Sequence, residues 1–215
     1  MDEKRERGPY ASGLARREAI LDVTVDLLAE VGYHGMSLRD VARRVGISHP
    51  GVIYHFPNKE ALLMAVVEHY EDDAGLNAAL SNKMEPLAVL DSFIEMTEKL
   101  YDTPVIVEME CMLVVEASSP LHPAHEHFNT RNERLVQILT RAWTRLQLEG
   151  KLRADEDAIH QANATIALWH GLKTVWLYDR SLDIPAALAK SLLAHFTPEF
   201  MPDMVDHYHD CGWIR

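Results

Sequence analysis

The sequence predicts an all-α protein of about nine helices. Apolar residues recur at steps of three and four along almost the whole chain, the spacing of a helix that is buried on one face. No strand-like alternation of useful length interrupts them, and capping residues precede several of these segments while glycine or proline follows them. The 215 residues are 47% hydrophobic and 25% charged, so we expect a globular chain with one large domain or two small ones.

The first helix and the two short helices after it are marked by their ends. Gly32 stands at the predicted C-cap of the first helix. Ser37, with Asp40 three residues on, resembles a capping box, and Gly46 closes that helix. Ser48 caps the third helix. We expect the inward faces of the three helices to consist of Ile20, Val23, Leu27, Val31, Leu38, Val41, Ala42, Val45, Val52, Ile53 and Phe56.

Longer helices make up the rest of the chain. Pro57 ends the third helix, because the residue before a proline is disfavoured in the helical region, and Asn58 caps a long fourth helix with Leu62, Leu63, Val66 and Tyr70. Residues 118–123 and 198–215 are expected to be irregular. Five further amphipathic helices are predicted at 86–101, 104–117, 124–149, 157–179 and 185–197.

Composition excludes several classes of protein. No stretch of about 18 uncharged apolar residues exists, so we expect no membrane span and no membrane partner. The charged start MDEKRERGPY has no apolar core after it, unlike a signal peptide. The two cysteines, Cys111 and Cys211, make no disulfide framework. A cytoplasmic location is therefore predicted.

Residues 37–59, SLRDVARRVGISHPGVIYHFPNK, predict a helix-turn-helix. The turn from Val45 to Ser48 is short, so the second helix can enter a DNA major groove. Lys59, at the start of the next helix, places a cation beside free backbone N–H groups, where phosphate binds well. The alternative is a plain three-helix subdomain packed on the rest. With Val52, Ile53 and Phe56 inward, the residues left outside are His49, Pro50, Gly51, Tyr54 and His55.

The charge distribution agrees with a nucleic-acid-binding head. Residues 1–60 carry nine Lys/Arg and nine Asp/Glu, whereas residues 61–215 carry twelve and twenty-four, so the whole net charge of −12 belongs to the second part. A neutral head on an acidic body is expected when only the head approaches phosphate.

From Arg17 to Tyr70, the stretches AILDVTVDLLAEVGYHGMSLRDVARRVGIS and IYHFPNKEALL closely resemble the DNA-binding head of the tetracycline-repressor (TetR) family of bacterial transcription regulators. His49 stands where many members have Lys or Arg, and Ile53 where many have Tyr, so base preference cannot be transferred. Part of the phosphate contact could shift to Arg39, Arg43 or Arg44. The resemblance places phosphate contacts at Ser37, Tyr54, His55 and Lys59, and base-edge contacts at Ser48, His49, Pro50 and Gly51.

The resemblance also implies a larger C-terminal domain that dimerises and binds a small molecule. The domains expected are an N-terminal disordered arm (1–13), a DNA-binding head (14–58), a ligand-binding and dimerisation domain (59–200) and a tail (201–215). The segment LEGKLRADED…IALWHGLKTVWL loosely resembles the betaine-regulator (BetI-like) branch.

The helix at 157–179 is apolar on several sides, which predicts burial against a partner subunit as well as its own core. The final predicted helix also has two apolar faces, and two such helices from each chain would make a four-helix interface. The alternative is an internal core helix of a monomer. The predicted dimer contacts are Trp169, Leu172, Trp176, Leu188, Leu192 and Phe196.

The middle helices carry the candidate ligand pocket. Its walls are apolar and adaptable, and methionine suits pockets that accept varied ligands. Glu116 and Arg131 are charged residues at mostly apolar positions and could orient a polar group of a ligand; surface exposure or a mutual ion pair is the alternative. Ordinary core packing is the alternative for each apolar residue. The predicted pocket residues are Phe93, Met96, Met109, Met112, Val115, Glu116, Phe128, Arg131, Leu135 and Trp169.

Two histidine-rich stretches offer ligand types that zinc accepts, one at His122–His127 and one at His207–Cys211. His125 and His127 cannot share one helical face at a two-residue step, so we expect no metal and no cofactor. The chain has no phosphate-binding glycine loop, GxSxG or HExxH, which argues against an enzyme. The function predicted is a dimeric repressor that binds a palindromic operator and is released by a small-molecule effector; a ligand-blind or activating DNA-binding dimer is the alternative.

Overall fold

The computed structural model describes residues 9–73, 84–101 and 103–215, and this part of the chain contains ten α-helices. The chain divides into two compact units, residues 1–69 and 70–215, which are described separately. The second unit begins at Tyr70, eleven residues beyond the expected start of the second domain at Lys59. No helix of the described residues is both long and apolar enough to cross a bilayer.

The first unit begins with α1 (Pro9–Gly35), which has a break at Gly32. Gly32 has φ 71° and ψ 174°, a backbone conformation that costs glycine little and other residues much. The predicted interruption is therefore confirmed, although a short helical segment continues to Gly35. The expected N-terminal arm lies outside the described residues up to residue 8, and residues 9–13 are helical rather than disordered.

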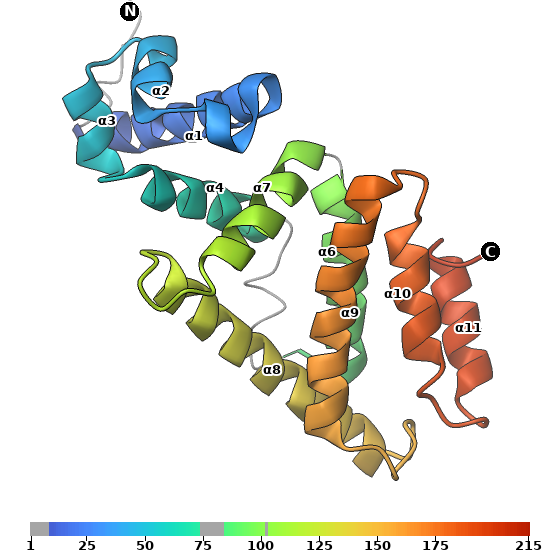
Figure 1. The fold of residues 1–215 in the computed structure, drawn as a ribbon. Coiled ribbons are helices and arrows are strands. Elements are labelled where there is room, and N and C mark those ends of the chain that lie inside the picture. The colour runs from blue at the N-terminus through green and yellow to red at the C-terminus, as the bar shows by residue number, and fades with distance from the viewer. Residues whose placement is uncertain (1–8, 74–83, 102) are drawn as a thin grey trace, which may run out of the picture. The chain divides into compact units, whose positions relative to one another are not determined.

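The two short helices α2 (Leu38–Val45) and α3 (His49–His55) pack with α1 in the first unit (Figure 1). Both predicted N-caps are confirmed. The Ser37 hydroxyl accepts from the Asp40 N–H while the Asp40 carboxylate reaches back to the Ser37 N–H, completing a capping box. Gly46 ends α2 in the left-handed conformation, at φ 79°. These local interactions determine where the turn between the two helices lies.

Helix α4 (Lys59–Asp73) completes the core of the first unit. The side-chain oxygen of Asn58 accepts a hydrogen bond from the Ala61 N–H at 2.7 Å, so the predicted cap is confirmed. Buried apolar side chains from all four helices form one small core; its fully buried members include Ile20, Leu21, Leu28, Val41, Val52, Leu62, Leu63 and Val66.

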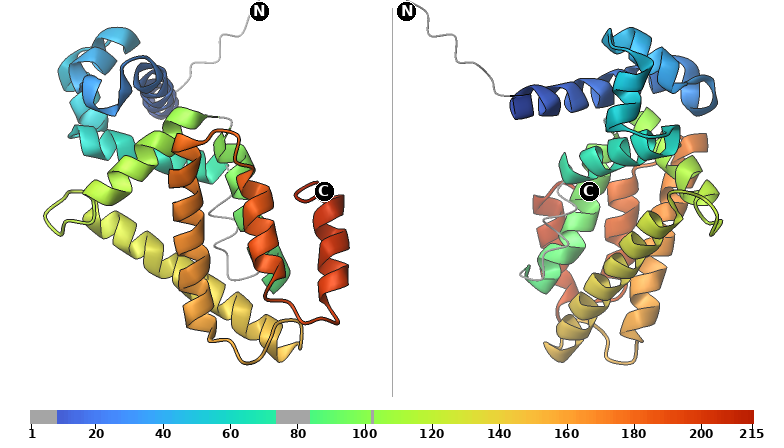
Figure 2. Two further views of the ribbon diagram at one scale, coloured as in Figure 1. Left: turned by 45° about the vertical axis from the view of Figure 1, so that its right-hand side comes forward. Right: turned by 90° about the vertical axis from the view of Figure 1, so that its left-hand side faces the viewer.

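The second unit consists of longer helices packed around α9. Helices α8 and α9 are close neighbours, α6 lies against α8, and α10 packs on both α6 and α9 (Figures 1 and 2). Helix α7 contacts α6 and α9. The helices follow the predicted segments closely: α6 (Pro86–Tyr101), α7 (Pro104–Glu116), α8 (His125–Leu148), α9 (Ala158–Tyr178) and α10 (Ile184–Leu193).

The expected irregular tail contains a helix instead. Helix α11 (Met201–Asp210) has Pro202 in its first turn and lies on the side of α10 away from α9 (Figure 2). Tyr208 and Trp213 are buried, and their rings pack against each other with centroids 5.4 Å apart. The expectation that 198–215 is irregular is therefore wrong for 201–210, because Pro202 lies in the first turn of a helix rather than preventing one.

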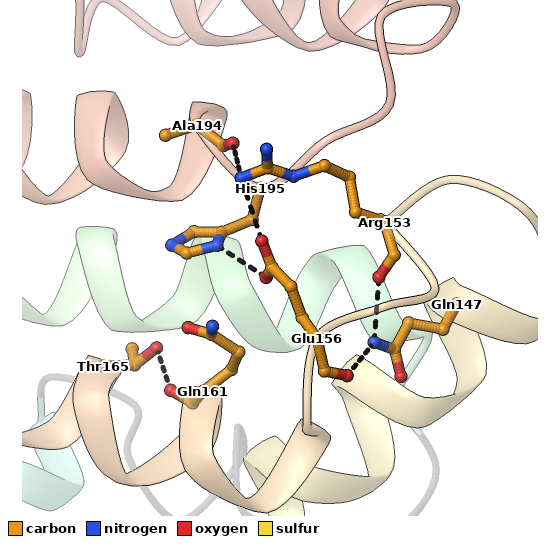
Figure 3. Close-up of polar contacts among 7 residues, drawn as sticks. All are labelled: Gln147, Arg153, Glu156, Gln161, Thr165, Ala194 and His195. Atoms are coloured by element: carbon orange, nitrogen blue, oxygen red, sulfur yellow. Dashed lines mark hydrogen bonds and ion pairs between the residues drawn. The ribbon is translucent and has the colours of Figure 1, made fainter.

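The connection between α8 and α9 is tied to the end of α10 (Figure 3). Arg153 donates to the Ala194 carbonyl at 2.9 Å, and the Glu156 carboxylate lies 2.8 Å from Nδ1 of His195. Gln147 donates to the carbonyl oxygens of both Arg153 and Glu156. These contacts hold the ends of α8, α9 and α10 together.

Candidate nucleic-acid interface and buried charged cluster

The predicted recognition helix presents its polar residues outward. Tyr54 is 86% exposed, Pro50 is exposed, and His49, Gly51 and His55 are partly exposed. The Ser48 hydroxyl accepts a hydrogen bond from the Gly51 N–H at 3.2 Å and so caps the helix. A side chain can therefore change at the tip of α3 without removing a core contact.

Ile53 is a correction to the sequence interpretation. It is 40% exposed, whereas its neighbour Val52 is fully buried and Phe56 nearly so. Val52 and Phe56 are four residues apart and share one helical face, while Ile53 is turned about 100° from Val52. A seven-residue helix with one packed side has no second inward face for it. Ile53 thus joins the outer surface of α3 as an apolar group.

A hollow on the surface of the first unit is lined by four of the residues predicted to contact DNA. Residues that the sequence analysis did not predict line it as well. Ser48, Gly51, Tyr54 and His55 line one side. Arg16, an exposed cation of α1, lies on the same hollow. The helix-turn-helix motif could not indicate Arg16, because Arg16 lies more than 30 residues before Ser48 in the chain. The full lining is Gly13, Arg16, Gly46, Ile47, Ser48, Gly51, Tyr54 and His55.

Other predicted phosphate-binding residues already have partners within the first unit. The Lys59 ammonium donates to the Tyr33 carbonyl and lies 4.6 Å from the centroid of the Tyr33 ring. Arg44 forms an exposed ion pair with Glu30, an interaction that costs little to exchange for a phosphate. Ser37 is engaged in the capping box, and Arg39 is exposed on α2. Lys59 therefore supports the fold of the head.

The second unit holds a buried cluster of three charged residues, Glu110 on α7, Arg131 on α8 and Lys173 on α9, which we call the buried charged cluster. The Lys173 ammonium donates to both Glu110 oxygens at 2.8 Å, and Arg131 donates to one of them at 3.2 Å. The ammonium also lies 3.7 Å from the centroid of the Trp169 ring. Such groups remain charged in a core only when they are paired.

Electrostatics keep this cluster in a defined protonation state. Burial alone would raise the pKa of Glu110, but the charges of Lys173 and Arg131 outweigh it and hold the pKa well below its usual range. Burial, and then the charge of Lys173, lowers the pKa of His170 to about 3. Glu110 is therefore ionised and His170 neutral at neutral pH.

The predicted pocket residues fall into two groups. Arg131 is buried, as expected for a pocket residue, and donates to Glu110, whereas Glu116 is exposed. Val115 is also exposed, at 71%, and so lines no interior site, while Met112 is partly exposed. The sequence did not predict Glu110, His170 and Lys173 as members of this site. The signal that could have found Glu110 and Lys173 is a charged residue within an otherwise apolar helical segment. The buried members of the prediction are Phe93, Met96, Met109, Phe128, Arg131, Leu135 and Trp169.

Most of the predicted dimer contacts lie in the core of the single chain. Trp169 and Leu188 are fully buried, and Trp176, Leu192 and Phe196 are at most 8% exposed. Leu172 is partly exposed. These residues of α9 are thus covered by α7, α8 and α10 and by aromatic side chains of α6. Five of the six predicted contact residues are therefore not exposed for contact with a second copy.

The histidine-rich stretches are used in ordinary contacts. His125 Nδ1 lies 2.8 Å from the Ala117 carbonyl, and His207 Nε2 lies 3.0 Å from the Asp91 carboxylate. Cys211 is 4.0 Å from the same His207 nitrogen. Within the described residues, no three His, Cys, Asp or Glu side chains are grouped closely enough to hold a metal ion.

Comparison with known proteins identifies the first unit. Residues 20–66 match the family model described as bacterial regulatory proteins, tetR family. The chain is 34% identical over 110 residues to the HTH-type transcriptional regulator RutR of Escherichia coli strain K12, a match that covers 50% of this chain and 51% of RutR. The chain therefore spans about half the length of the curated relatives it matches.

Solved structures resemble the chain over most of its length. NalD, the secondary repressor of the MexAB-OprM multidrug efflux pump in Pseudomonas aeruginosa, is 23% identical with a TM-score of 0.67, over 86% of this chain and 98% of NalD. The SmeT–triclosan complex is 20% identical with a TM-score of 0.68, over 86% of this chain and 93% of SmeT; SmeT is the repressor of a Stenotrophomonas maltophilia multidrug efflux pump. At these identities the likeness shows a shared fold.

Proposed function

Because this chain belongs to the TetR family of transcription regulators, we propose that it is a dimeric repressor that binds a palindromic operator and leaves it when a small molecule binds the second unit. The family consists of regulators rather than enzymes. The single observation that carries the proposal is the capped α2–turn–α3 unit with its outward polar tip. Acting on chromosomal DNA would place the protein in the cytoplasm.

The groove-reading surface is proposed to centre on α3. Pro50, Gly51 and Tyr54 would approach base edges and sugar–phosphate from the tip of the helix, with His49, Ser48 and His55 beside them. A Cβ added at Gly51 would lie 3.3 Å from the Ser48 hydroxyl, so the glycine keeps this side of the helix thin. The phosphate contacts proposed are Arg16, Ser37, Arg39, Arg44 and Lys59.

A second copy is proposed to dock on the outer face of α9. Ala167, Gly171, Val175 and Tyr178 lie about one helical turn apart and are all exposed. A Cβ at Gly171 would meet open space, so another helix could come close there. A hollow between α9 and α10 adjoins this face and would accept side chains of the partner; it is lined by Gln161, Ala164, Thr165, Leu168, Leu188, Ser191, Leu192 and His195.

Effector release requires a difference in affinity between two states of the protein. A small molecule that favours a state with wrongly spaced heads needs a coupling of about 1–3 kcal/mol to change operator affinity roughly 5–150-fold. The SmeT–triclosan complex supports this part of the proposal, since a protein of the same fold binds a small molecule.

Arg16 offers a sharp test, because the chain provides a matched control. Arg16→Ala and Arg134→Ala each remove one exposed arginine, the first beside α3 and the second on α8. DNA fragments that flank the gene are titrated with each protein at several salt concentrations. We expect Arg16→Ala alone to weaken binding and to reduce the slope of log K against log salt by about 1. Equal behaviour of the two variants, or no binding by the unaltered protein, would contradict the proposal.

A further inference from the structure

Two hydrogen-bond donors near the buried charged cluster are not used by the Glu110 carboxylate, the acceptor of that cluster. The Trp169 indole nitrogen and the Tyr101 hydroxyl are both buried, and neither has a hydrogen-bond partner among the described residues. An unpartnered buried donor is costly, so native cores contain few of them. The Trp169 ring faces the Lys173 ammonium, and Tyr101 lies within electrostatic range of Glu110, so these two unpartnered donors indicate a place where an acceptor binds.

The surroundings specify what kind of acceptor suits the site. The Lys173 ammonium already holds a carboxylate by both oxygens, that of Glu110, at 2.8 Å each. Tyr101 stays a neutral donor, because burial, and then the charges of Cys111 and Glu110, raises its pKa. One ammonium with two neutral donors matches a single negative charge.

Several of the side chains near these donors are aromatic. The Phe93 and Trp169 rings meet edge to face with centroids 5.9 Å apart, and the Tyr101 and Trp176 rings with centroids 4.5 Å apart. Phe128 lies under the Arg131 guanidinium, 5.8 Å from it. Aromatic walls with a few polar groups at one end are typical of small-molecule sites.

We propose that Lys173, Trp169 and Tyr101 form the polar end of an effector site for a small monocarboxylate with an apolar body, and that Glu110 holds the ammonium until the effector's carboxylate replaces it. Glu110 then retains Arg131 as its partner, so no carboxylate is left alone in the core. This inference rests on the proposed function, since it names the effector class of that regulator.

The exchange also supplies a switching element. Helix α7 carries Glu110, and its N-cap Thr103 makes no side-chain capping hydrogen bond. The Glu110–Lys173 pair connects α7 directly to α9. Replacement of Glu110 by a ligand carboxylate removes that connection and favours a state in which α7 is released, which is the differential interaction that a population shift needs.

Three acids and their amides provide the probes: benzoate, phenylacetate and hexanoate against benzamide, phenylacetamide and hexanamide. Calorimetric titration of the full chain at neutral pH, without DNA, measures binding. We expect at least one acid to bind tenfold or more tightly than its amide, because only the acid supplies a charged acceptor. Equal binding of acid and amide in every pair, or no binding of any acid at millimolar concentration, would overturn the proposal.

Variants assign the binding to these residues. Lys173→Met should abolish the preference for acid over amide, and Lys190→Met, which removes an exposed lysine of α10, should retain it. Tyr101→Phe removes only a donor, whereas Trp169→Phe removes a donor together with part of a buried ring. Each should weaken the acid about 2–10-fold, which keeps the test open if Lys173→Met fails to fold. Unchanged acid binding in both donor variants would contradict the site.

Hydrogen exchange of the α7 amides reports on the switch. Faster exchange in α7 with the bound acid is expected, and unchanged exchange would contradict the release of α7. A ligand-free protein that fails to bind DNA would count against the proposed function alone, whereas acid binding that ignores Lys173 would count against this site alone.

Discussion

The Lys173 ammonium on α9 lies 2.8 Å from both carboxylate oxygens of Glu110 on α7, a residue 63 positions earlier in the chain. Each side chain is 1% exposed. Burying such a pair often contributes less stability than apolar residues of the same volume, but removal of one partner strands a charge in the core. Substitutions of this pair can therefore distinguish a contribution to folding stability from a contribution to function.

Glu110→Gln should destabilise the protein by about 3–5 kcal/mol, because it leaves the Lys173 ammonium without its carboxylate. The double variant Glu110→Leu with Lys173→Met removes both charges and should recover most of that loss. Urea unfolding followed by circular dichroism measures both. A double variant as unstable as Glu110→Gln would show that the cost comes from packing rather than from an uncompensated charge.

His170 predicts a specific dependence of stability on pH. Its pKa in the folded protein is about 3, below the ordinary value of 6.5, so the unfolded chain binds more protons between these values. The free energy of unfolding should therefore fall as the pH falls below 6.5, by about 2 kcal/mol between pH 6.5 and 5. His170→Gln should reduce this loss over the same interval, as measured by urea unfolding at each pH. Identical slopes for the variant and the unaltered chain would disprove the assignment.

Ile53 on α3 and Phe56, the C-cap of the same helix, should respond differently to truncation. Phe56→Ala removes a ring that is 3% exposed and should cost about 3–5 kcal/mol of stability. Ile53→Ala removes a 40% exposed side chain and should cost less than about 1 kcal/mol, while operator affinity falls. Thermal unfolding and DNA titration give the two values. A large loss of stability at Ile53 would restore the inward orientation expected from the sequence.

The outer face of α9 should control association. Val175→Arg places a charge on the proposed dimer face, where Val175 is 53% exposed, and should convert the dimer to monomer in analytical ultracentrifugation. Val115→Arg makes the same change at a 71% exposed position of α7 and should leave the dimer intact. If both variants sediment like the unaltered protein, the partner docks elsewhere.

The sequence predicted accurately those helix ends whose capping groups lie close together in the chain. The capping box at Ser37, the left-handed Gly46 and the serine cap of α3 all depend on groups within a few residues of one another, and the structure has each of them. Helix α11 was missed because Pro202 was taken as a breaker, although proline is favoured in a first turn. What buries α11 is contact with other helices, which local propensity does not express.

By itself, the sequence determined the helices, their ends and the helix-turn-helix, because hydrogen bonds and caps there join residues close together in the chain. Only the tertiary structure decided which side of each helix is covered. It turned Ile53 outward, enclosed Trp169 within its own subunit, placed Arg16 beside α3 and joined Glu110 to Lys173. Such pairings depend on how helices pack across long stretches of chain, and a periodic pattern shows that a face is buried without showing what covers it.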